Sequence, residues 1–269
     1  MANNKIEIRN LYKVFGDHAK TKMQHVHAGI SKQELLDQHG HVLGLRDINI
    51  KVRSKRIQVI MGLSGSGKST LIRHINRLIE PTEGEVIVDG EDVLSMSTEG
   101  LRDFRRHKAS MVFQRFGLLP HRTVTQNVAY GLTIQGISEG EAGERSQRWI
   151  DRVGLSGFEQ HFPAQLSGGM QQRVGLARAL ATDAEILLMD EAFSALDPLI
   201  RTDMQNILLD LQEELHKTIV FITHDLDEAL RIGDEIAILR DGEVIQQGDP
   251  QSIIMRPADD YIADFIKDI

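Results

Sequence analysis

The stretch Gly62-Leu63-Ser64-Gly65-Ser66-Gly67-Lys68-Ser69 decides the fold, because it matches the spacing G-x-x-x-x-G-K-[ST]. It directly follows the apolar run Ile57–Met61 and opens a helical pattern that continues through Ile75 and Leu78. A strand, a glycine-rich loop and a helix in this order form a phosphate-binding loop, in which backbone N–H groups and the helix N-terminus face phosphate oxygens. The sequence therefore predicts a site for the phosphates of a nucleotide.

Lys68 and Ser69 carry the chemistry of this loop. We expect the Lys68 ammonium to reach the β- and γ-phosphates of ATP and the Ser69 hydroxyl to ligate Mg²⁺. ATP and Mg²⁺ are thus the expected cofactors. The residues of this stretch that we expect to contact ATP are Gly62, Ser64, Gly65, Ser66, Gly67, Lys68, Ser69 and Thr70.

The composition is that of a soluble protein with one sizeable core. The chain has 269 residues, of which 41% are hydrophobic, and 31 basic against 39 acidic side chains give a net charge of −8. An acidic balance argues against non-specific binding to nucleic acid. There is no cysteine, which excludes disulfides and thiolate metal sites. No apolar run approaches the roughly 20 residues of a membrane span, and the N-terminus lacks the apolar region of a secretory signal, so we expect a cytosolic protein.

Short apolar runs alternate with helical patterns, which predicts an α/β fold with a parallel sheet. Ile6 and Ile8, like Ile48, Ile50 and Val52, alternate with polar residues and indicate half-exposed strands. The Asp89-Gly90 and Asp241-Gly242 pairs indicate hairpin turns, and therefore antiparallel strands at the edge of the sheet. Besides 57–61, the continuous apolar runs that predict strands buried on both faces are Met111–Phe113, Ile186–Met189 and Ile219–Thr223.

Two segments interrupt the α/β pattern. Residues 116–166 contain no convincing buried strand and predict an inserted helical lobe, with Ala142, Trp149, Ile150 and Val153 on one helix face. Residues 16–44 form a polar insert, in which Ser31 and Glu34 have the spacing of a capping box before a short helix that stops at Gly40. The predicted core is then 1–115 and 167–248, followed by a helical tail over 249–269.

The tail and the insert each have a structural interpretation that we prefer. In the tail, Ile262, Phe265, Ile266 and Ile269 share one helix face, which favours packing against the protein's own core. The insert holds five of the eleven histidines, but no carboxylate–histidine spacing accompanies them. Scattered surface histidines are therefore favoured over a metal site.

Asp190 and Glu191 follow the apolar run Ile186–Met189. An acidic residue at the tip of a buried strand can hold Mg²⁺ through water, and the next carboxylate can position an attacking water. The pair is weak alone, but it becomes a strong signal in a chain with a phosphate-binding loop.

Leu166-Ser167-Gly168-Gly169-Met170 lies between the glycine-rich loop and the acidic strand, and it leads into a helical run. With this signature the chain resembles the nucleotide-binding subunit of an ATP-binding-cassette (ABC) transporter over essentially its whole length. The other landmarks of that family occur in order: Gln114, the loop Ser194-Ala195-Leu196-Asp197, and His224.

The resemblance implies a role for each matching residue. Gln114 senses the γ-phosphate and Mg²⁺, Glu191 is the general base, and His224 holds the γ-phosphate and the attacking water. Gln114 joins Ser69 and Asp190 as a Mg²⁺ residue, and Lys68 joins the catalytic set.

The resemblance also implies a homodimer. Ser167, Gly168 and Gly169 close over ATP bound to the opposite subunit, and Asp197 links the two sites. Phe15 is our choice for the aromatic residue that stacks on adenine, with Tyr12 as the competitor.

Within this family, the sequence of these motifs resembles that of the importers of glycine betaine, proline and related quaternary amines. The stretches that carry this likeness are LSGGM (166–170), GISKQELLDQHG (29–40), FGLLPHRTV (116–124) and MDEAFSALDPLIRTDMQ (189–205). Such a subunit is peripheral on the cytoplasmic face of the inner membrane, with an integral permease as partner and a substrate-binding protein as an indirect one. A coupling helix of the permease would dock near residues 115–121, or else Phe116, Leu118 and Leu119 are core of the lobe.

Several alternatives remain at this point. The cargo could be another solute, such as a polar amino acid, or the cassette could act in solution on DNA or the ribosome, or serve as a scaffold without turnover. Many members of the subfamily continue into a pair of regulatory CBS domains, which we do not expect in a chain that stops at Ile269. Either a shorter branch of the family or a shortened chain would explain this.

Overall fold

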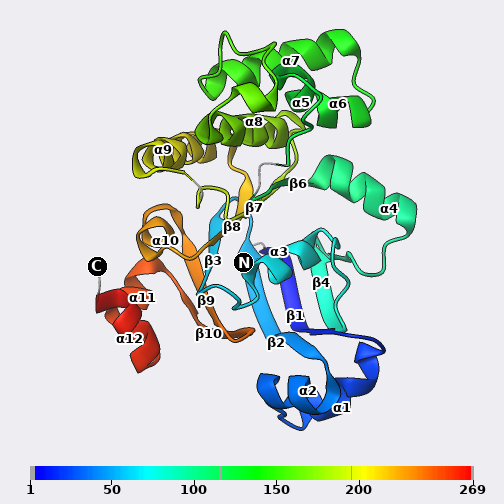
Figure 1. The fold of residues 1–269 in the computed structure, drawn as a ribbon, viewed down its shortest axis with the longest axis vertical. Coiled ribbons are helices and arrows are strands. Elements are labelled where there is room, and N and C mark those ends of the chain that lie inside the picture. The colour runs from blue at the N-terminus through cyan, green and yellow to red at the C-terminus, as the bar shows by residue number, and fades with distance from the viewer. Residues whose placement is uncertain (1–3, 115–116, 195, 268–269) are drawn as a thin grey trace. The chain divides into compact units, whose positions relative to one another are not determined.

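The computed structural model describes residues 4–114, 117–194 and 196–267, and the chain divides into two compact units. The first unit comprises residues 1–97 and 222–269, and the second comprises residues 98–221 (Figure 1). Strand β8 (Thr218–Thr223) runs across the division, with all six of its residues buried.

The first unit contains two groups of strands and the insert. Its elements are β1 (Asn4–Phe15), η1 (Ala19–Lys22), α1 (Met23–His27), α2 (Lys32–His39), β2 (Val42–Arg53), β3 (Ile57–Met61), α3 (Lys68–Ile75), β4 (Glu83–Val88), β5 (Glu91–Asp92), α10 (Leu226–Ile232), β9 (Glu235–Arg240), β10 (Glu243–Gly248), α11 (Pro250–Met255) and α12 (Asp260–Lys267).

These strands confirm an α/β fold with both parallel and antiparallel pairing. β3 is parallel to β9, and β9 is antiparallel to β10. β2, β1, β4 and β5 form a separate four-stranded antiparallel sheet, so the antiparallel part is larger than the edge that the sequence predicts. Ile6 and Ile8 are buried on one face of β1, as the alternating pattern predicts.

The two predicted hairpin turns are confirmed. Asp89 and Gly90 have φ values of 52° and 85°, and Asp241 and Gly242 have values of 51° and 83°. Two consecutive residues with positive φ give a turn whose twist matches that of the flanking strands. The first turn joins β4 to β5, and the second joins β9 to β10.

The insert folds as predicted from its capping box. The Ser31 hydroxyl accepts the Glu34 N–H at 3.1 Å, and the Glu34 carboxylate accepts the Ser31 N–H at 2.9 Å. Helix α2 then ends at His39, and Gly40 follows with a φ of 65°. The apolar side chains that bury the insert against β1 and β2 are Val14, Met23, Val26, Leu35 and Leu43.

The second unit contains the remaining helices of the described residues. Its elements are α4 (Thr98–Asp103), η2 (Phe104–Lys108), β6 (Ala109–Val112), α5 (Val124–Val128), α6 (Tyr130–Ile134), α7 (Glu139–Arg152), η3 (Pro163–Gln165), α8 (Gly168–Ala181), β7 (Ile186–Asp190) and α9 (Pro198–Leu215). β6 and β7 are parallel.

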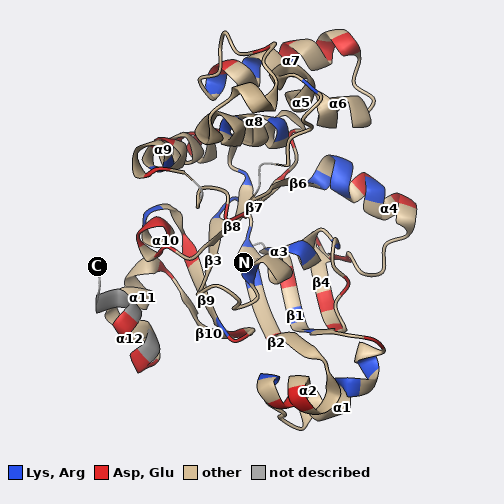
Figure 2. Cartoon of the chain, viewed as in Figure 1, with Lys and Arg blue, Asp and Glu red and all other residues tan. Residues whose placement is uncertain are grey.

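Helices α5, α6, α7 and α8 of this unit share one apolar cluster. Helix α7 buries Ala142, Ser146 and Ile150, and Figure 2 marks acidic and basic residues at other positions of this helix. The partners of α7 in the cluster include Val124 and Val128 of α5 and Val174 of α8. The contacts therefore group α5–α7 with α8 and with the flanking strands. The boundaries of the second unit fall at 97/98 and 221/222, whereas the helical lobe predicted from the sequence is shorter and covers residues 116–166.

Two sequence predictions about elements are corrected. The strand predicted at 111–113 is β6, which ends at Val112. Its residues Ser110 and Met111 are only half-buried, because β6 is an edge strand. Helix α3 ends at Ile75 rather than at Leu78, since Arg77 has a φ of 52° and Leu78 is exposed.

The tail is helical where it is described. Ile262 of α12 is buried, whereas the side chains of Phe265 and Ile266 and all of Ile269 lie outside the described residues. None of the helices in the described ranges is both long enough and apolar enough to cross a bilayer.

Candidate functional site

The glycine-rich loop leaves the end of β3, a strand with all five residues buried. Gly62 has a φ of 151°, and a Cβ atom there would lie 2.1 Å from the carbonyl oxygen of Leu239. Gly67, the N-cap of α3, has a φ of 102°, and a Cβ atom would lie 2.7 Å from Leu45. Only glycine fits both positions, so the motif spacing corresponds to a backbone path that turns tightly into the helix.

Lys68 is nearly buried, and its ammonium lies within the curl of the loop. Its Nζ donates to the carbonyl oxygens of Gly62 at 2.8 Å and Leu63 at 3.1 Å. The turn between β9 and β10 supports the loop, because the Gly242 N–H donates to the Ser66 carbonyl at 3.0 Å. Of the remaining loop residues predicted to contact ATP, Ser64 and Gly65 are exposed at the tip, while Ser69 and Thr70 are half-buried in the first turn of α3.

His224 directly follows β8 and is exposed. The backbone beyond it is fixed by two hydrogen bonds. The Asp225 N–H donates to the Thr223 hydroxyl, and the Asp225 carboxylate caps α10 by accepting the Glu228 N–H, both at 3.0 Å. His224 is therefore presented from a rigid connection between a strand and a helix.

The two candidate aromatic residues have different surroundings. Phe15 is the last residue of β1 and is 38% exposed, with the Lys13 ammonium 4.9 Å from the ring centroid. Tyr12 packs against the core of the insert, and its ring meets that of His27 edge-on at 5.0 Å. Burial, followed by the charges of Asp47 and Glu83, raises the pKa of Tyr12. Of the two rings, Phe15 offers the more open surface for stacking.

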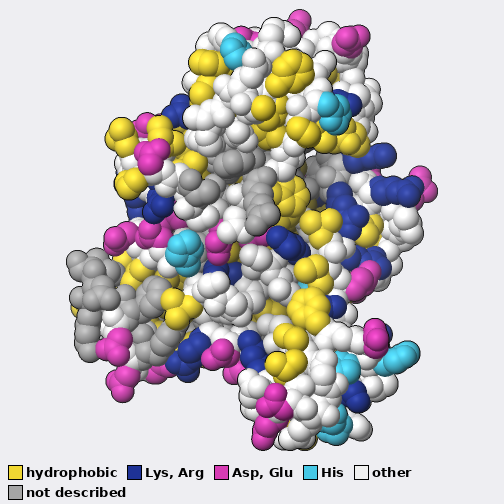
Figure 3. Space-filling model, viewed as in Figure 1, with side chains coloured by type: hydrophobic (Ala, Val, Ile, Leu, Met, Phe, Trp, Pro, Cys, Tyr) yellow, Lys and Arg dark blue, Asp and Glu magenta, His cyan; other side chains and the backbone are white. Residues whose placement is uncertain are grey.

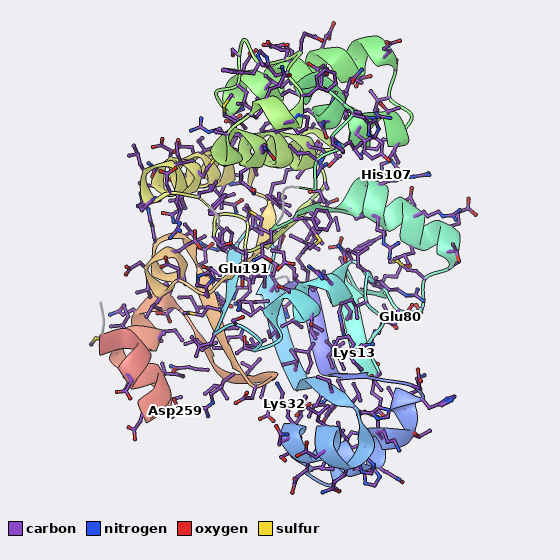
Figure 4. The ribbon with its side chains drawn as sticks, viewed as in Figure 1. Lys13, Lys32, Glu80, His107, Glu191 and Asp259 are labelled. Atoms are coloured by element: carbon purple, nitrogen blue, oxygen red, sulfur yellow. The ribbon has the colours of Figure 1, made fainter. Side chains whose placement is uncertain are left out.

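The acidic pair lies in the second unit, at the end of β7. Asp190 is fully buried, and Glu191 leaves the strand with a φ of 46°. The Gln114 amide, which follows β6, donates to the Glu191 carboxylate at 2.9 Å. The Glu191 carbonyl in turn accepts from the Ser194 N–H at 3.2 Å and the Ser194 hydroxyl at 2.9 Å (Figure 4 labels Glu191). The structure thus joins two residues that lie 77 positions apart in the sequence.

The signature begins helix α8. Ser167 is its N-cap, and its hydroxyl accepts the Met170 N–H at 3.3 Å, while Ser167 and Gly168 are exposed. A Cβ atom on Gly169 would lie 2.7 Å from Cγ2 of Ile200 in the first turn of α9. Asp197 is the N-cap of α9 and accepts the Ile200 N–H at 3.1 Å. The signature and the Asp197 loop are therefore in direct contact within one unit, although Ala195 of that loop lies outside the described residues.

Two residues of the second unit have structural roles that the sequence analysis did not predict. Asn127 is fully buried, and its Nδ2 donates to the carbonyl oxygens of Leu119, Arg122 and Thr123 at 2.9–3.1 Å, while its Oδ1 accepts the Leu119 N–H at 2.8 Å. Arg178 of α8 donates to the Gly117 carbonyl at 2.7 Å, and burial lowers its pKa. Both hold the segment 117–123, which we call the docking loop.

The docking loop contains part of the stretch that the sequence assigns to a coupling helix. Leu118 packs partly against the helical cluster, as its alternative interpretation predicts. Leu119 is half-buried, and Arg115 and Phe116 lie outside the described residues. A capping box at Thr123 and Gln126 was the available signal for a helix starting here, but nothing in the sequence identified Asn127 as its anchor.

Comparison with known proteins places these features in a family. The ABC transporter family model matches residues 45–194. The chain is 53% identical over 265 residues to the glycine betaine transport ATP-binding protein OpuAA of Bacillus subtilis, which covers 98% of this chain and 63% of OpuAA. It is 46% identical over 269 residues to the trimethylamine N-oxide transport system ATP-binding protein TmoW of Pelagibacter ubique, covering 79% of that protein.

A solved structure gives the same fold. The ATP-binding cassette MJ0796, described as a dimer in a post-hydrolysis state bound to ADP and Pi, matches with a TM-score of 0.78 and 33% identity. The match covers 91% of this chain and 98% of that chain. The chain spans less than two thirds of the length of OpuAA and about four fifths of that of TmoW. It belongs to the ABC transporter family and, within it, to the group of ATP-binding proteins that includes the glycine betaine and trimethylamine N-oxide relatives.

Proposed function

We propose that this chain is the ATP-hydrolysing subunit that powers import of a quaternary amine or similar compatible solute through a separate membrane permease. It acts as a homodimer at the cytoplasmic face of the membrane, and a substrate-binding protein delivers the solute to the permease. The observation that carries the proposed hydrolysis is the 2.9 Å hydrogen bond between Gln114 and Glu191, because it connects the candidate base to the residue assigned to the γ-phosphate.

Each element of the chain supplies one function in this proposal. The curled N–H groups of residues 62–69 and the Lys68 ammonium hold the phosphates of ATP. Glu191 accepts the proton of the attacking water, and Gln114 orients the Glu191 carboxylate. His224, which follows the end of β8, holds the γ-phosphate and the attacking water. Ser167 and the adjacent N–H groups at the start of α8 cover the nucleotide bound to a second copy, because a helix N-terminus attracts anions.

Mg²⁺ fits the oxygen donors that the chain offers. The Ser69 hydroxyl, the Gln114 amide oxygen and the buried Asp190 carboxylate are hard ligands of the type that Mg²⁺ prefers. The metal, when bound with ATP, would neutralise the charge that develops on the phosphates.

Glu191→Gln tests the assignment of the base. Because an amide cannot accept the proton of water, ATP hydrolysis should fall by roughly 100-fold or more, while ATP binding is retained. The measurement is phosphate release by the purified protein, with equilibrium binding of ATP measured alongside. Glu213→Gln is the matched control, since Glu213 is an exposed residue of α9. Hydrolysis at the parental rate in Glu191→Gln would show that another group is the base.

The cargo is tested separately from hydrolysis. Vesicles that contain the complex of this subunit with its permease and binding protein should take up labelled glycine betaine in an ATP-dependent manner. Uptake of a polar amino acid, with no uptake of glycine betaine, would instead support the alternative cargo.

A further inference from the structure

The insert begins and ends at the ring that we assign to adenine. Phe15 is the last residue of β1, Val42 is the first of β2, and the two are paired across the strands. Residues 16–41 therefore form one long connection that leaves the sheet at Phe15 and returns directly opposite it. Figure 3 shows histidine side chains gathered over this end of the first unit, which carries α1 and α2.

His41 connects the two ends of this insert. The residue is only 8% exposed, with Nε2 2.7 Å from the Asp17 carbonyl oxygen and Nδ1 2.6 Å from the His39 carbonyl oxygen. The ring also lies against Gly16, whose φ is 133°, and a Cβ atom there would lie 2.6 Å from Cδ2 of His41. The backbone that follows Phe15 is thus fixed to the C-terminus of α2.

The partners of His41 determine which form of its ring fits. A carbonyl oxygen only accepts hydrogen bonds, so both ring nitrogens satisfy their partners only when each carries a proton. The His39 ring is itself stacked on that of His25, with ring centroids 4.4 Å apart. Burial, followed by the charges of His25, Lys22 and His41, lowers the pKa of His39.

The position of the Phe15 ring depends on this backbone. A Cβ atom on Gly44 would lie 2.7 Å from Cε2 of Phe15, so β2 supports one edge of the ring closely. The Lys13 ammonium, which also donates to the Glu80 carbonyl at 2.8 Å, lies near the ring (Figure 4 labels Lys13 and Glu80). The chain leaves Phe15 through Gly16 and Asp17, and because His41 contacts both residues, it constrains the direction in which the chain continues.

We propose that His41 is a positioning residue for the Phe15 ring and that the insert is thereby part of the nucleotide site. The proposal rests on the proposed function of Phe15 as the ring that stacks on adenine. It predicts that the insert governs recognition of the base and leaves recognition of the phosphates unchanged.

The test compares two ligands, ATP and inorganic tripolyphosphate, which has the phosphates without the base. Isothermal titration calorimetry of His41→Asn should show ATP binding weakened by roughly three- to tenfold, the value of one aromatic stack, with tripolyphosphate binding unchanged. Gly16→Ala, which places a methyl group against the His41 ring, should give the same selective loss. His18→Asn is the matched control, because His18 is exposed in the same loop and has a φ of 53°, which asparagine tolerates.

Unchanged ATP affinity in His41→Asn, or an equal loss of affinity for both ligands, would overturn the proposal. Lys68→Ala separates this from the proposed function: if that variant binds both ligands normally, the phosphate site itself is assigned wrongly.

Discussion

At the candidate site, the roles of some single residues can be predicted from a sequence motif, whereas the roles of others depend on the folded structure. The spacing of Gly62 and Gly67 reflects two positions where backbone conformation and close neighbours both exclude a side chain, and this could be read from the sequence. The roles of Asn127 and His41 could not, because each depends on carbonyl oxygens that only the folded chain brings into reach. The assigned catalytic roles of Glu191 and His224 stay predictions.

His74 gives a prediction about stability at the residue scale. It is fully buried in α3, and burial, with a smaller contribution from the Lys13 charge, lowers its pKa to about 4. The unfolded chain binds a proton at this residue below about pH 6.5, whereas the folded chain does not until about pH 4. Stability should therefore fall as the pH decreases across this window, by about 2 kcal/mol at pH 5 relative to pH 7.

Urea unfolding at pH 7 and pH 5 measures this effect. His74→Leu should lose about that much less stability between the two pH values than the parent does. His18→Asn, which changes an exposed histidine, should behave like the parent. An identical pH dependence in parent and His74→Leu would exclude His74 as the source.

At the scale of elements, apolar patterns predicted that a strand exists more accurately than they predicted the residues at which an element begins and ends. β7 and β8 are buried as their continuous apolar runs predict, whereas β6 is shorter and half-exposed because it lies at an edge. The end of α3 was misjudged because Leu78 continues the apolar spacing, although the chain turns at Arg77. Local chemistry such as the capping box of α2 was readable, since both partners lie within three residues.

The docking loop gives a prediction at this scale. Asn127→Ala removes four hydrogen bonds and leaves buried carbonyl oxygens without a donor, so the free energy of unfolding should drop by about 3 kcal/mol. In the assembled transporter, stimulation of ATP hydrolysis by the permease should be reduced further than basal hydrolysis. Gln251→Ala, at an exposed position of α11, is the control. Equal stability of Asn127→Ala and the parent would contradict the anchoring role.

At the scale of the whole molecule, the chain carries a phosphate loop in one unit and a signature in the other. The signature residues Ser167 and Gly168 are exposed at a helix N-terminus, as a surface that receives a nucleotide from another copy must be. The arrangement of the two units could not be predicted from the sequence, because local patterns describe only residues that lie close together along the chain. The family likeness therefore supplied the dimer as a prediction.

Assembly tests that prediction. With Mg²⁺ and ATP, Glu191→Gln should form a dimer by light scattering, because slow hydrolysis preserves the nucleotide that joins two copies. The double variant Glu191→Gln/Ser167→Arg should stay monomeric, since a bulky side chain would occupy the start of α8, which is proposed to cover the nucleotide of the second copy. Ser156→Arg, at another exposed serine of the second unit, should leave the dimer intact. A protein that stays monomeric in all three cases would refute the homodimer.

The contact between Gly169 and Ile200 leaves no room for even a methyl group between the first turns of α8 and α9. A movement of either helix start is therefore expected to displace the other, including Asp197, the N-cap of α9. In the proposed homodimer, release of the nucleotide covered by Ser167 would then move the Asp197 loop, the predicted link to the second site.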